Sequence, residues 1–191
     1  MQYIGLAVLW SLYFLHHSLL SSGSIKAKLL KAGVSLRIQR LIYSFISAIG
    51  LLLLLFYNGA LGGDKLLPEH RGVKALALFL AAAGVFIIRE AYKAYNFSAF
   101  LGFTEESKED LKDTGIQAHI RQPLYSATIL IFCGFFLYDS RLASLISLVC
   151  VLAYLPLGIW LEEKKLIMLY GEKYVQYTQA VPALVPNFRR R

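Results

Sequence analysis

The chain has little charge and few cysteines. Only 17% of its 191 residues are charged, and it contains two cysteines. Soluble globular proteins usually have about 25% charged residues. Cys133 and Cys150 have no CxxC spacing and no neighbouring histidine, which argues against a disulfide framework and against a thiolate metal site. We expect both cysteines to be small apolar fillers between helices.

The sequence also lacks the motifs of several large enzyme classes. It has no glycine-rich phosphate loop, no nucleophile elbow and no paired-acid hydrolase signature. It has no internal repeat and no inverted pair of interrupted helices, so a transporter is the weakest of the functions considered.

Histidine is scarce as well, and its spacing does not suit a metal. His16 and His17 are adjacent, so on a helix they point about 100° apart and cannot share one ion. His119 lies near Arg121, without a carboxylate at ligand spacing. We predict no metal centre, and we expect His16 or His17 to hydrogen-bond across helices or to cap a polar pocket.

Long apolar runs are what the chain has in abundance. Hydrophobic residues make up 57% of it, and its mean hydropathy is +0.54. We predict an all-α, polytopic membrane protein with about five transmembrane helices, each near the roughly 17 to 25 residues that a tilted span needs. The first has no basic residues before it and no small-residue cleavage site, so we interpret it as a mature helix. The expected spans are Tyr3–Leu20, Leu41–Tyr57, Val73–Ile88, Leu124–Tyr138 and Leu142–Leu161.

The formal charge of +8 is concentrated on one side of these spans. If the amino terminus is outside, 16 of the 20 Lys and Arg residues lie in inner segments, and only Lys65, Arg71, Lys74 and Arg141 lie outside. The positive-inside bias therefore predicts a multi-pass membrane protein with its amino terminus outside and its carboxyl terminus in the cytoplasm. Anionic lipid accounts for the basic loops, so we expect membrane lipids and no nucleic acid as partners. The sequence gives no signal for the oligomeric state.

The last two spans form a hairpin whose polar ends must meet. Only residues 139–141 separate the two helices, so Arg121 before the fourth span and Glu162 and Glu163 after the fifth lie on the same membrane face. A helix C-terminus disfavours carboxylates by up to about 1 kcal/mol, so a positive partner is expected. Either Lys164 and Lys165 fill that role on the solvent side, or Arg121 or a cationic ligand does so on the bundle side.

A further helix is predicted after the fifth span. Leu166, Tyr170, Tyr174 and Tyr177 recur at the spacing of one helical face. We expect an amphipathic cytoplasmic helix that breaks at Gly171 and folds back on the bundle before Pro182 and Pro186. Its tyrosines either anchor the chain at the interface or face a site.

The chain divides into two regions on these patterns. Residues 1–114 form an amino-terminal three-span region with an interfacial loop, and residues 115–191 form the hairpin and tail. Within the loop, we expect residues 96–103 to lie along the membrane surface and residues 104–113 to be a solvated linker.

As an ordered set, the carboxyl-terminal motifs resemble the membrane methyltransferases related to isoprenylcysteine carboxyl methyltransferase and phospholipid methyltransferase. The order is Gly, then Arg-x-Pro-x-Tyr, then Glu-Glu-x-x-Leu, then Gly-x-x-Tyr-x-x-Tyr, then Val-Pro, and the match covers residues 115–186. Residues 15–20 and 100–102 look more like the bacterial branch that includes methanethiol S-methyltransferase. The matching residues are Gly115, Arg121, Pro123, Tyr125, Glu162, Glu163, Leu166, Gly171, Tyr174, Tyr177, Val181 and Pro182.

The resemblance implies an enzyme that uses S-adenosyl-L-methionine, held between the mouth of the hairpin and the folded-back tail. The implied acceptor is small or lipophilic: a thiol, a lipid or an isoprenylcysteine-like group. A sulfonium, an amino-acid zwitterion and an adenine suit acids, an arginine and aromatic rings, and methyl transfer depends mainly on in-line positioning. No catalytic residue is assigned. The implied cofactor-binding residues are Gly115, Arg121, Gln122, Pro123, Tyr125, Glu162, Glu163, Tyr174 and Tyr177.

Two positions depart from the pattern. Gln122 stands where the family usually has histidine, which keeps hydrogen bonding but loses the titratable ring. Ala180 stands where the isoprenylcysteine enzymes have an arginine, so a prenylcysteine carboxylate is a less expected acceptor. These departures motivate an alternative, a non-catalytic membrane accessory or sensor protein that keeps the methyltransferase fold.

Overall fold

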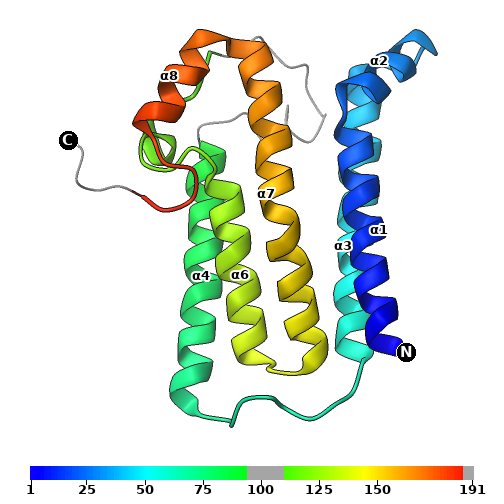
Figure 1. Cartoon of the computed structure of the whole chain (residues 1–191), viewed down its shortest axis with the longest axis vertical. Helices are drawn as coiled ribbons and strands as arrows, with labels where there is room; N and C mark the ends of the chain where they lie inside the picture. Colours follow the sequence, from blue (N-terminus) through cyan, green and yellow to red (C-terminus); the bar gives the residue numbers. More distant parts are fainter. Residues whose placement is uncertain (94–109, 187–191) are drawn as a thin grey trace.

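The computed structural model describes residues 1–93 and 110–186, and its regular elements within those ranges are helices. The all-α prediction is therefore confirmed. Most of the loop segment predicted for residues 96–113 lies outside the described residues. In chain order the helices are α1 (Gln2–Ser21), α2 (Gly23–Lys31), α3 (Leu36–Ala60), α4 (Arg71–Lys93), η1 (Gly115–Ala118), α6 (Pro123–Tyr138), α7 (Leu142–Tyr170) and α8 (Glu172–Ala180) (Figure 1).

The five predicted spans correspond to α1, α3, α4, α6 and α7. Four of these are long and apolar enough to cross a membrane, which confirms a polytopic membrane protein. The exception is α6, which has 16 residues. At 1.5 Å per residue it is about 24 Å long, shorter than a hydrocarbon core of about 30 Å. The fourth span is thus shorter than a typical membrane crossing.

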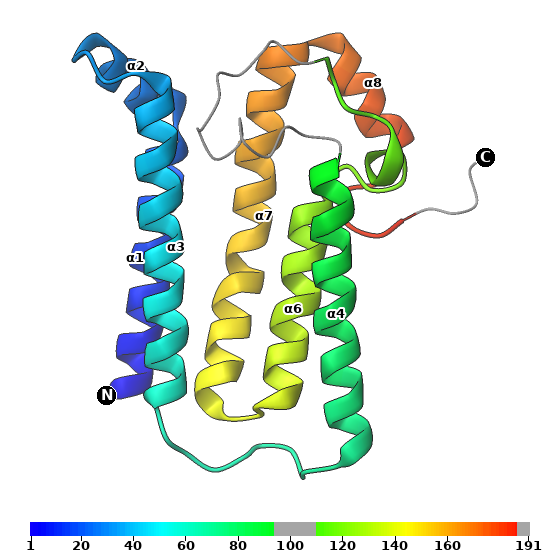
Figure 2. The same cartoon turned by 180° about the vertical axis from the view of Figure 1, so that it is seen from behind.

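The helices form two groups that run side by side (Figures 1 and 2). One group is α1 with α3, and the other is α4, α6 and α7. Within the second group α4 and α6 approach closely at glycines: a Cβ atom on Gly134 would lie 2.6 Å from the Ala77 carbonyl oxygen, and one on Gly84 would lie 2.9 Å from that of Ala127. Small residues are the usual means of bringing membrane helices together.

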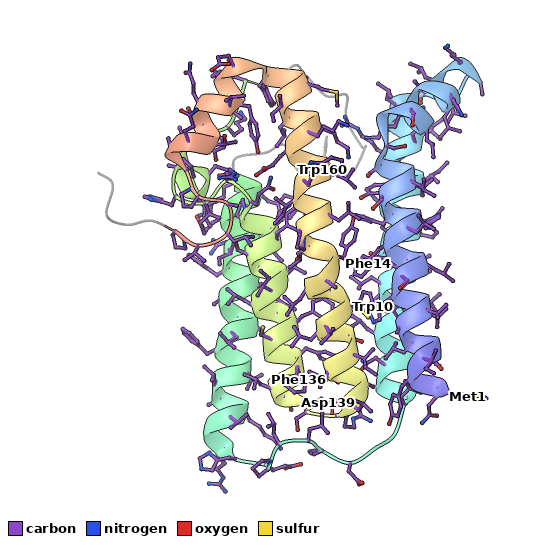
Figure 3. The ribbon with its side chains drawn as sticks, viewed as in Figure 1. Met1, Trp10, Phe14, Phe136, Asp139 and Trp160 are labelled. Atoms are coloured by element: carbon purple, nitrogen blue, oxygen red, sulfur yellow. The ribbon has the colours of Figure 1, made fainter. Side chains whose placement is uncertain are left out.

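Aromatic side chains of α1 join the two groups. Trp10 and Phe14 lie between α1 and α7 (Figure 3). The Phe14 ring stacks on Tyr154 of α7, with the centroids 4.2 Å apart, and Trp10 is 1% exposed. This layer is the main apolar core of the molecule.

The bundle has two chemically different ends. We call the end with residues 139–141 between α6 and α7 the turn end. The opposite end, with the start of α6, the end of α7 and α8, is the site end. There α7 continues beyond Leu161 to Tyr170, and Gly171, with φ 59°, turns the chain into α8. The predicted break at Gly171 and the folded-back helix are both confirmed, because α8 packs back toward the start of α6 (Figures 1 and 2).

Candidate functional site

An ion pair connects the two arms of the hairpin at the site end. Arg121 Nε donates to Glu163 Oε1 over 2.7 Å, and the two side chains are 17% and 22% exposed. The three-residue turn at the other end of the hairpin makes this meeting possible. For Glu163, the positive partner is therefore Arg121 on the bundle side, which was one of the two expected alternatives.

Arg121 also holds the tail in place. Its Nη1 donates to the carbonyl oxygens of Val181 at 2.7 Å and Thr178 at 3.3 Å. These carbonyls lie at the end of α8, where a helix has unsatisfied acceptors and favours a cation. Nη2 of Arg121 makes no hydrogen bond within residues 1–93 and 110–186, so it remains available for another anion.

The chain after α8 runs along the start of α6. The backbone N–H groups of Arg121 and Gln122 donate to the carbonyls of Pro182 and Ala183, each over 3.0 Å. Ser126 Oγ donates to the Leu184 carbonyl over 2.7 Å. The tail carbonyls thus accept from the two N–H groups that precede α6 and from one hydroxyl of its first turn, which begins with Pro123.

Beneath this tail lie buried polar atoms without partners. In the described part of the chain, Gln117 Oε1, Gln122 Nε2 and Tyr174 Oη make no hydrogen bond of normal length and angle, although the Gln122 side chain lies close enough to Tyr174 to lower the pKa of its phenol. The three residues are 2%, 6% and 1% exposed. An unsatisfied buried polar group costs about 1–3 kcal/mol. Such atoms are therefore rare in native structures and call for an explanation, and an absent polar ligand is one.

Tyr174 is buried next to the Arg121–Glu163 ion pair. Burial raises the pKa of Tyr174 to about 12, and the nearby Glu163 carboxylate adds to the shift. The phenol is therefore fully protonated at neutral pH and can donate a hydrogen bond. Its neighbour Tyr177 is engaged already, since the Tyr177 hydroxyl donates to the Gln117 carbonyl over 2.6 Å.

Glu162 faces a different part of the bundle from Glu163. Its Oε2 lies 3.8 Å from Lys165 Nζ, and the same ammonium donates to Ser21 Oγ of α1 over 3.3 Å. Neighbouring residues on a helix point about 100° apart. Glu163 therefore pairs with Arg121 beside the tail, whereas Glu162 is connected to α1 through Lys165. The solvent-side alternative thus applies to Glu162, through Lys165 rather than the exposed Lys164.

Tyr125 lies on the Glu162 side of the hairpin. Its ring packs on Gly158 of α7, where an added Cβ atom would meet the Tyr125 hydroxyl and the Tyr154 ring at 3.1 Å. The Glu162 carboxylate is close enough to the Tyr125 phenol to interact with it electrostatically. The half-buried Tyr125 hydroxyl makes no hydrogen bond within the described ranges.

The nine residues expected at one cofactor site therefore fall into two groups. Gly115, at φ 65°, opens η1 in a conformation that favours glycine and leads into the buried segment. Tyr125 and Glu162 are on the side facing α1. The residues brought together around the tail are Arg121, Gln122, Pro123, Glu163, Tyr174 and Tyr177.

Sequence reasoning missed two residues at this end. Gln117 donates from Nε2 to the Ala91 carbonyl over 3.2 Å and so ties η1 to α4. Ser126 binds the tail, as described above. Neither belongs to a periodic pattern, and a single glutamine or serine in a polar segment gives no signal before the tertiary contacts are known.

His17 makes the contact across helices that was expected of one of the two histidines. Its Nε2 lies 2.8 Å from the Tyr43 hydroxyl and its Nδ1 lies 3.2 Å from Ser47 Oγ, both on α3. His16 is exposed. Among residues 1–93 and 110–186, no three His, Cys, Asp or Glu side chains lie in an arrangement that suits a metal ion.

The fold and the side-chain contacts define a class: a helical membrane protein with a buried polar cluster where its helices end. The sequence comparison makes the class more specific. The model of the phospholipid methyltransferase family matches residues 73–173, which is more than half of the chain, and the chain belongs to that family. The match includes the Arg121–Glu163 pair and ends before the tail residues that Arg121 holds.

One curated relative matches over almost the whole chain. Methanethiol S-methyltransferase from Crocosphaera subtropica (strain ATCC 51142 / BH68) is 25% identical over 187 residues, which are 93% of this chain and 72% of that protein. No solved structure matches the chain. Family and fold together identify a membrane protein of a methyltransferase family.

Proposed function

We propose that this protein transfers the methyl group of S-adenosyl-L-methionine to a small or lipophilic acceptor at the site end of its bundle. The observation that carries the proposal is the pair of buried, neighbouring side chains Gln122 and Tyr174, whose Nε2 and Oη make no hydrogen bond of normal geometry, beside the Arg121–Glu163 ion pair. We place the site on the cytoplasmic side of a bacterial inner membrane, in line with the distribution of basic residues.

The residues around the tail fit the cofactor chemically. Arg121 has one guanidinium nitrogen left for the carboxylate of the amino-acid moiety, and Glu163 is an acceptor for its ammonium group. Gln122 and Tyr174 would donate hydrogen bonds to hydroxyl or adenine acceptors. When bound, the cofactor supplies an electrophilic methyl group on a sulfonium. The chain's own task is to hold the reactants in line and to keep water out.

A thiol is the acceptor that we favour. The relative that matches most of this chain carries methanethiol in its name. Ala180 provides no cation for a prenylcysteine carboxylate. A thiol also requires little recognition beyond an apolar pocket and a group that accepts its proton.

Calorimetry tests cofactor binding directly. We expect S-adenosylhomocysteine to bind the purified protein in lipid nanodiscs, and we expect Glu163→Gln to weaken that binding at least about tenfold, because a charge-assisted hydrogen bond contributes about 1.5–3 kcal/mol. Lys164→Gln, one residue further along α7 and exposed, is the matched control and should bind like the wild type. Absence of heat at millimolar ligand would contradict the proposal.

A non-catalytic accessory or sensor is the second candidate function. Gln122 in place of the family's histidine is the observation that favours it. Methyl transfer from labelled cofactor into thiols, membrane lipids and prenylcysteine distinguishes the two. Binding of S-adenosylhomocysteine without transfer to any of these acceptors would support the sensor.

A further inference from the structure

A second group of polar side chains lies between α1, α3 and α7 near the site end. His17 contacts Tyr43 and Ser47, as given above, and Ser18 Oγ lies 2.8 Å from the Tyr154 hydroxyl. These five residues occupy helices that otherwise expose apolar side chains. Ionisable and hydroxyl groups within membrane helices are costly and usually serve binding, catalysis or helix association.

Accessibility argues for more than helix association. All five of these residues are half-buried, so their side chains are partly exposed at the surface of the bundle. A comparable network at the turn end, built on Asn58, Ser144 and Ser147, has each of these residues 0% exposed. The polar residues near the site end are thus partly exposed, whereas those of the turn-end network, which hold helices together, are fully buried.

This open group adjoins the part of the hairpin that the cofactor residues leave unused. The Tyr43 phenol interacts electrostatically with Glu162 and Tyr125, and the His17 ring interacts with Lys165. Tyr125 and Glu162 lie on the side of the hairpin that faces α1, and Glu162 also acts electrostatically on Tyr174 of α8. A molecule beside Tyr43 would therefore lie next to the hairpin and near Glu162, which adjoins both groups.

We propose that the Tyr43–His17 pair is the proton-accepting group for the methyl acceptor, which binds between α3 and the hairpin beside Tyr125. This rests on the function proposed above. It assigns the proton-accepting group to α1 and α3 and the cofactor to residues of the hairpin and the tail.

The transfer of the thiol proton follows from the hydrogen bonds of the pair. The thiol gives its proton to the Tyr43 oxygen while the Tyr43 hydroxyl proton passes to His17 Nε2, and Nδ1–H of the ring donates to Ser47 Oγ. The thiolate sulfur then forms a bond to the methyl carbon. The bond from that carbon to the sulfonium sulfur breaks with its electron pair left on sulfur, so neutral S-adenosylhomocysteine remains. His17 afterwards releases its proton to water.

Charges from every packed helix act on this pair. Lys165 is the cation that acts on the His17 ring, and Glu162 is the anion that acts on the Tyr43 phenol. The remaining titratable neighbours are tyrosines and the adjacent histidine. The groups that face the pair are His16 and Tyr13 from α1, Tyr125 from α6, and Tyr154, Glu162 and Lys165 from α7.

Acceptors of different acidity test the proposal. We expect Tyr43→Phe and His17→Gln in nanodiscs to lower kcat for ethanethiol about 10²-fold, the usual size of a general-base contribution. The loss should shrink to less than about fivefold with thiophenol, which is far more acidic and enters as thiolate. A residue that only supports the fold would lower both rates equally. Affinity for S-adenosylhomocysteine should stay within twofold of the wild type.

His16→Gln is the matched control, since it changes the neighbouring exposed histidine, and it should keep full activity. Thermal unfolding of each variant confirms that it is folded. The inference is overturned if the folded variants keep wild-type kcat with ethanethiol, or if they lose equal activity with both thiols. A wild-type protein that binds no S-adenosylhomocysteine or transfers no methyl group to any thiol overturns the proposed function itself, and is distinguishable from the first two outcomes.

Discussion

The two ends of the bundle use the same kinds of residue in opposite ways. At the turn end, Asp139 and Arg141 pair over 2.7 Å, and Arg141 Nη1 donates to the Leu61 carbonyl over 2.7 Å. At the site end, Arg121 and Glu163 pair over the same distance, but buried polar atoms around them are unpartnered. One end is satisfied internally, and the other, by our proposal, is completed by a ligand.

The turn-end network extends into the helices. Trp10 Nε1 and Asn58 Nδ2 both donate to Ser147 Oγ over 2.8 Å. Ser144 Oγ lies 3.3 Å from Asn58 Oδ1 and 3.1 Å from Asp139 Oδ2. Figure 3 places Trp10 between α1 and α7 and Asp139 at the hairpin turn. The network therefore fastens α1 and α3 to the hairpin, whereas the described residues of the site end include buried polar atoms outside any such network.

The largest effect on ligand affinity is expected from a substitution at the site end. Arg121→Met removes the partner of Glu163 and the donor to the α8 carbonyls, so we expect affinity for S-adenosylhomocysteine to fall by about 10²-fold or more. The half-buried acid left behind should destabilise the fold by about 2 kcal/mol, below the 3–5 kcal/mol of a fully buried pair. Calorimetry and limited proteolysis of the tail measure the two effects. If the Arg121→Met protein bound S-adenosylhomocysteine with wild-type affinity, Arg121 would not be a cofactor-binding residue.

At the turn end the expected effect is on stability alone. Asn58→Leu removes an amide that is 0% exposed and leaves the Ser144 and Ser147 hydroxyls with one partner fewer. We expect a loss of about 2 kcal/mol in the free energy of unfolding, measured by denaturation in detergent. Cofactor affinity should not change. If Asn58→Leu instead weakened S-adenosylhomocysteine binding more than threefold at full stability, the two ends would not be independent.

A smaller effect is expected at Tyr174, where one substitution should raise stability and lower ligand affinity. Tyr174→Phe removes a buried hydroxyl that has no partner, so the ligand-free protein should become more stable by about 1 kcal/mol. Affinity for S-adenosylhomocysteine should drop about five- to tenfold, because the ligand loses a donor. Ser147→Ala, the control from the satisfied network, should lower stability and leave affinity as it is. Lower stability together with unchanged affinity in Tyr174→Phe would show that this hydroxyl is structural.

The smallest expected effect is pH-dependent. Hydrogen bonds from Arg141 lower the pKa of Asp139 below its ordinary value of about 3.9. The stabilisation is therefore fully present above the ordinary value and is lost as the pH falls through the lowered one. The melting temperature of the wild type should approach that of Asp139→Asn only below about pH 4. A constant difference between the two proteins from pH 7 to pH 3 would contradict the assignment.

Much of the fold follows from local patterns in the sequence. Five apolar runs predict five helices, and Gly171 predicts the break before α8 because its backbone adopts positive φ readily. A turn of only three residues between two long helices requires Arg121 and the acidic pair to lie at the same end. Covalent reach and helical rise are sufficient for these conclusions. The motif order alone likewise indicates the methyltransferase family that the comparison confirms.

Tertiary packing decided the rest. Which acid meets Arg121 depends on the rotation of α7 about its axis, which is set by Gly158 against Tyr125 and by the aromatic layer on α1, not by the sequence near Glu162. The tail's pairing with α6 and the contact of His17 with Tyr43 join residues that are far apart in the chain. No sequence period or spacing predicts such contacts, because they depend on which helices pack together and on how each helix is rotated about its axis.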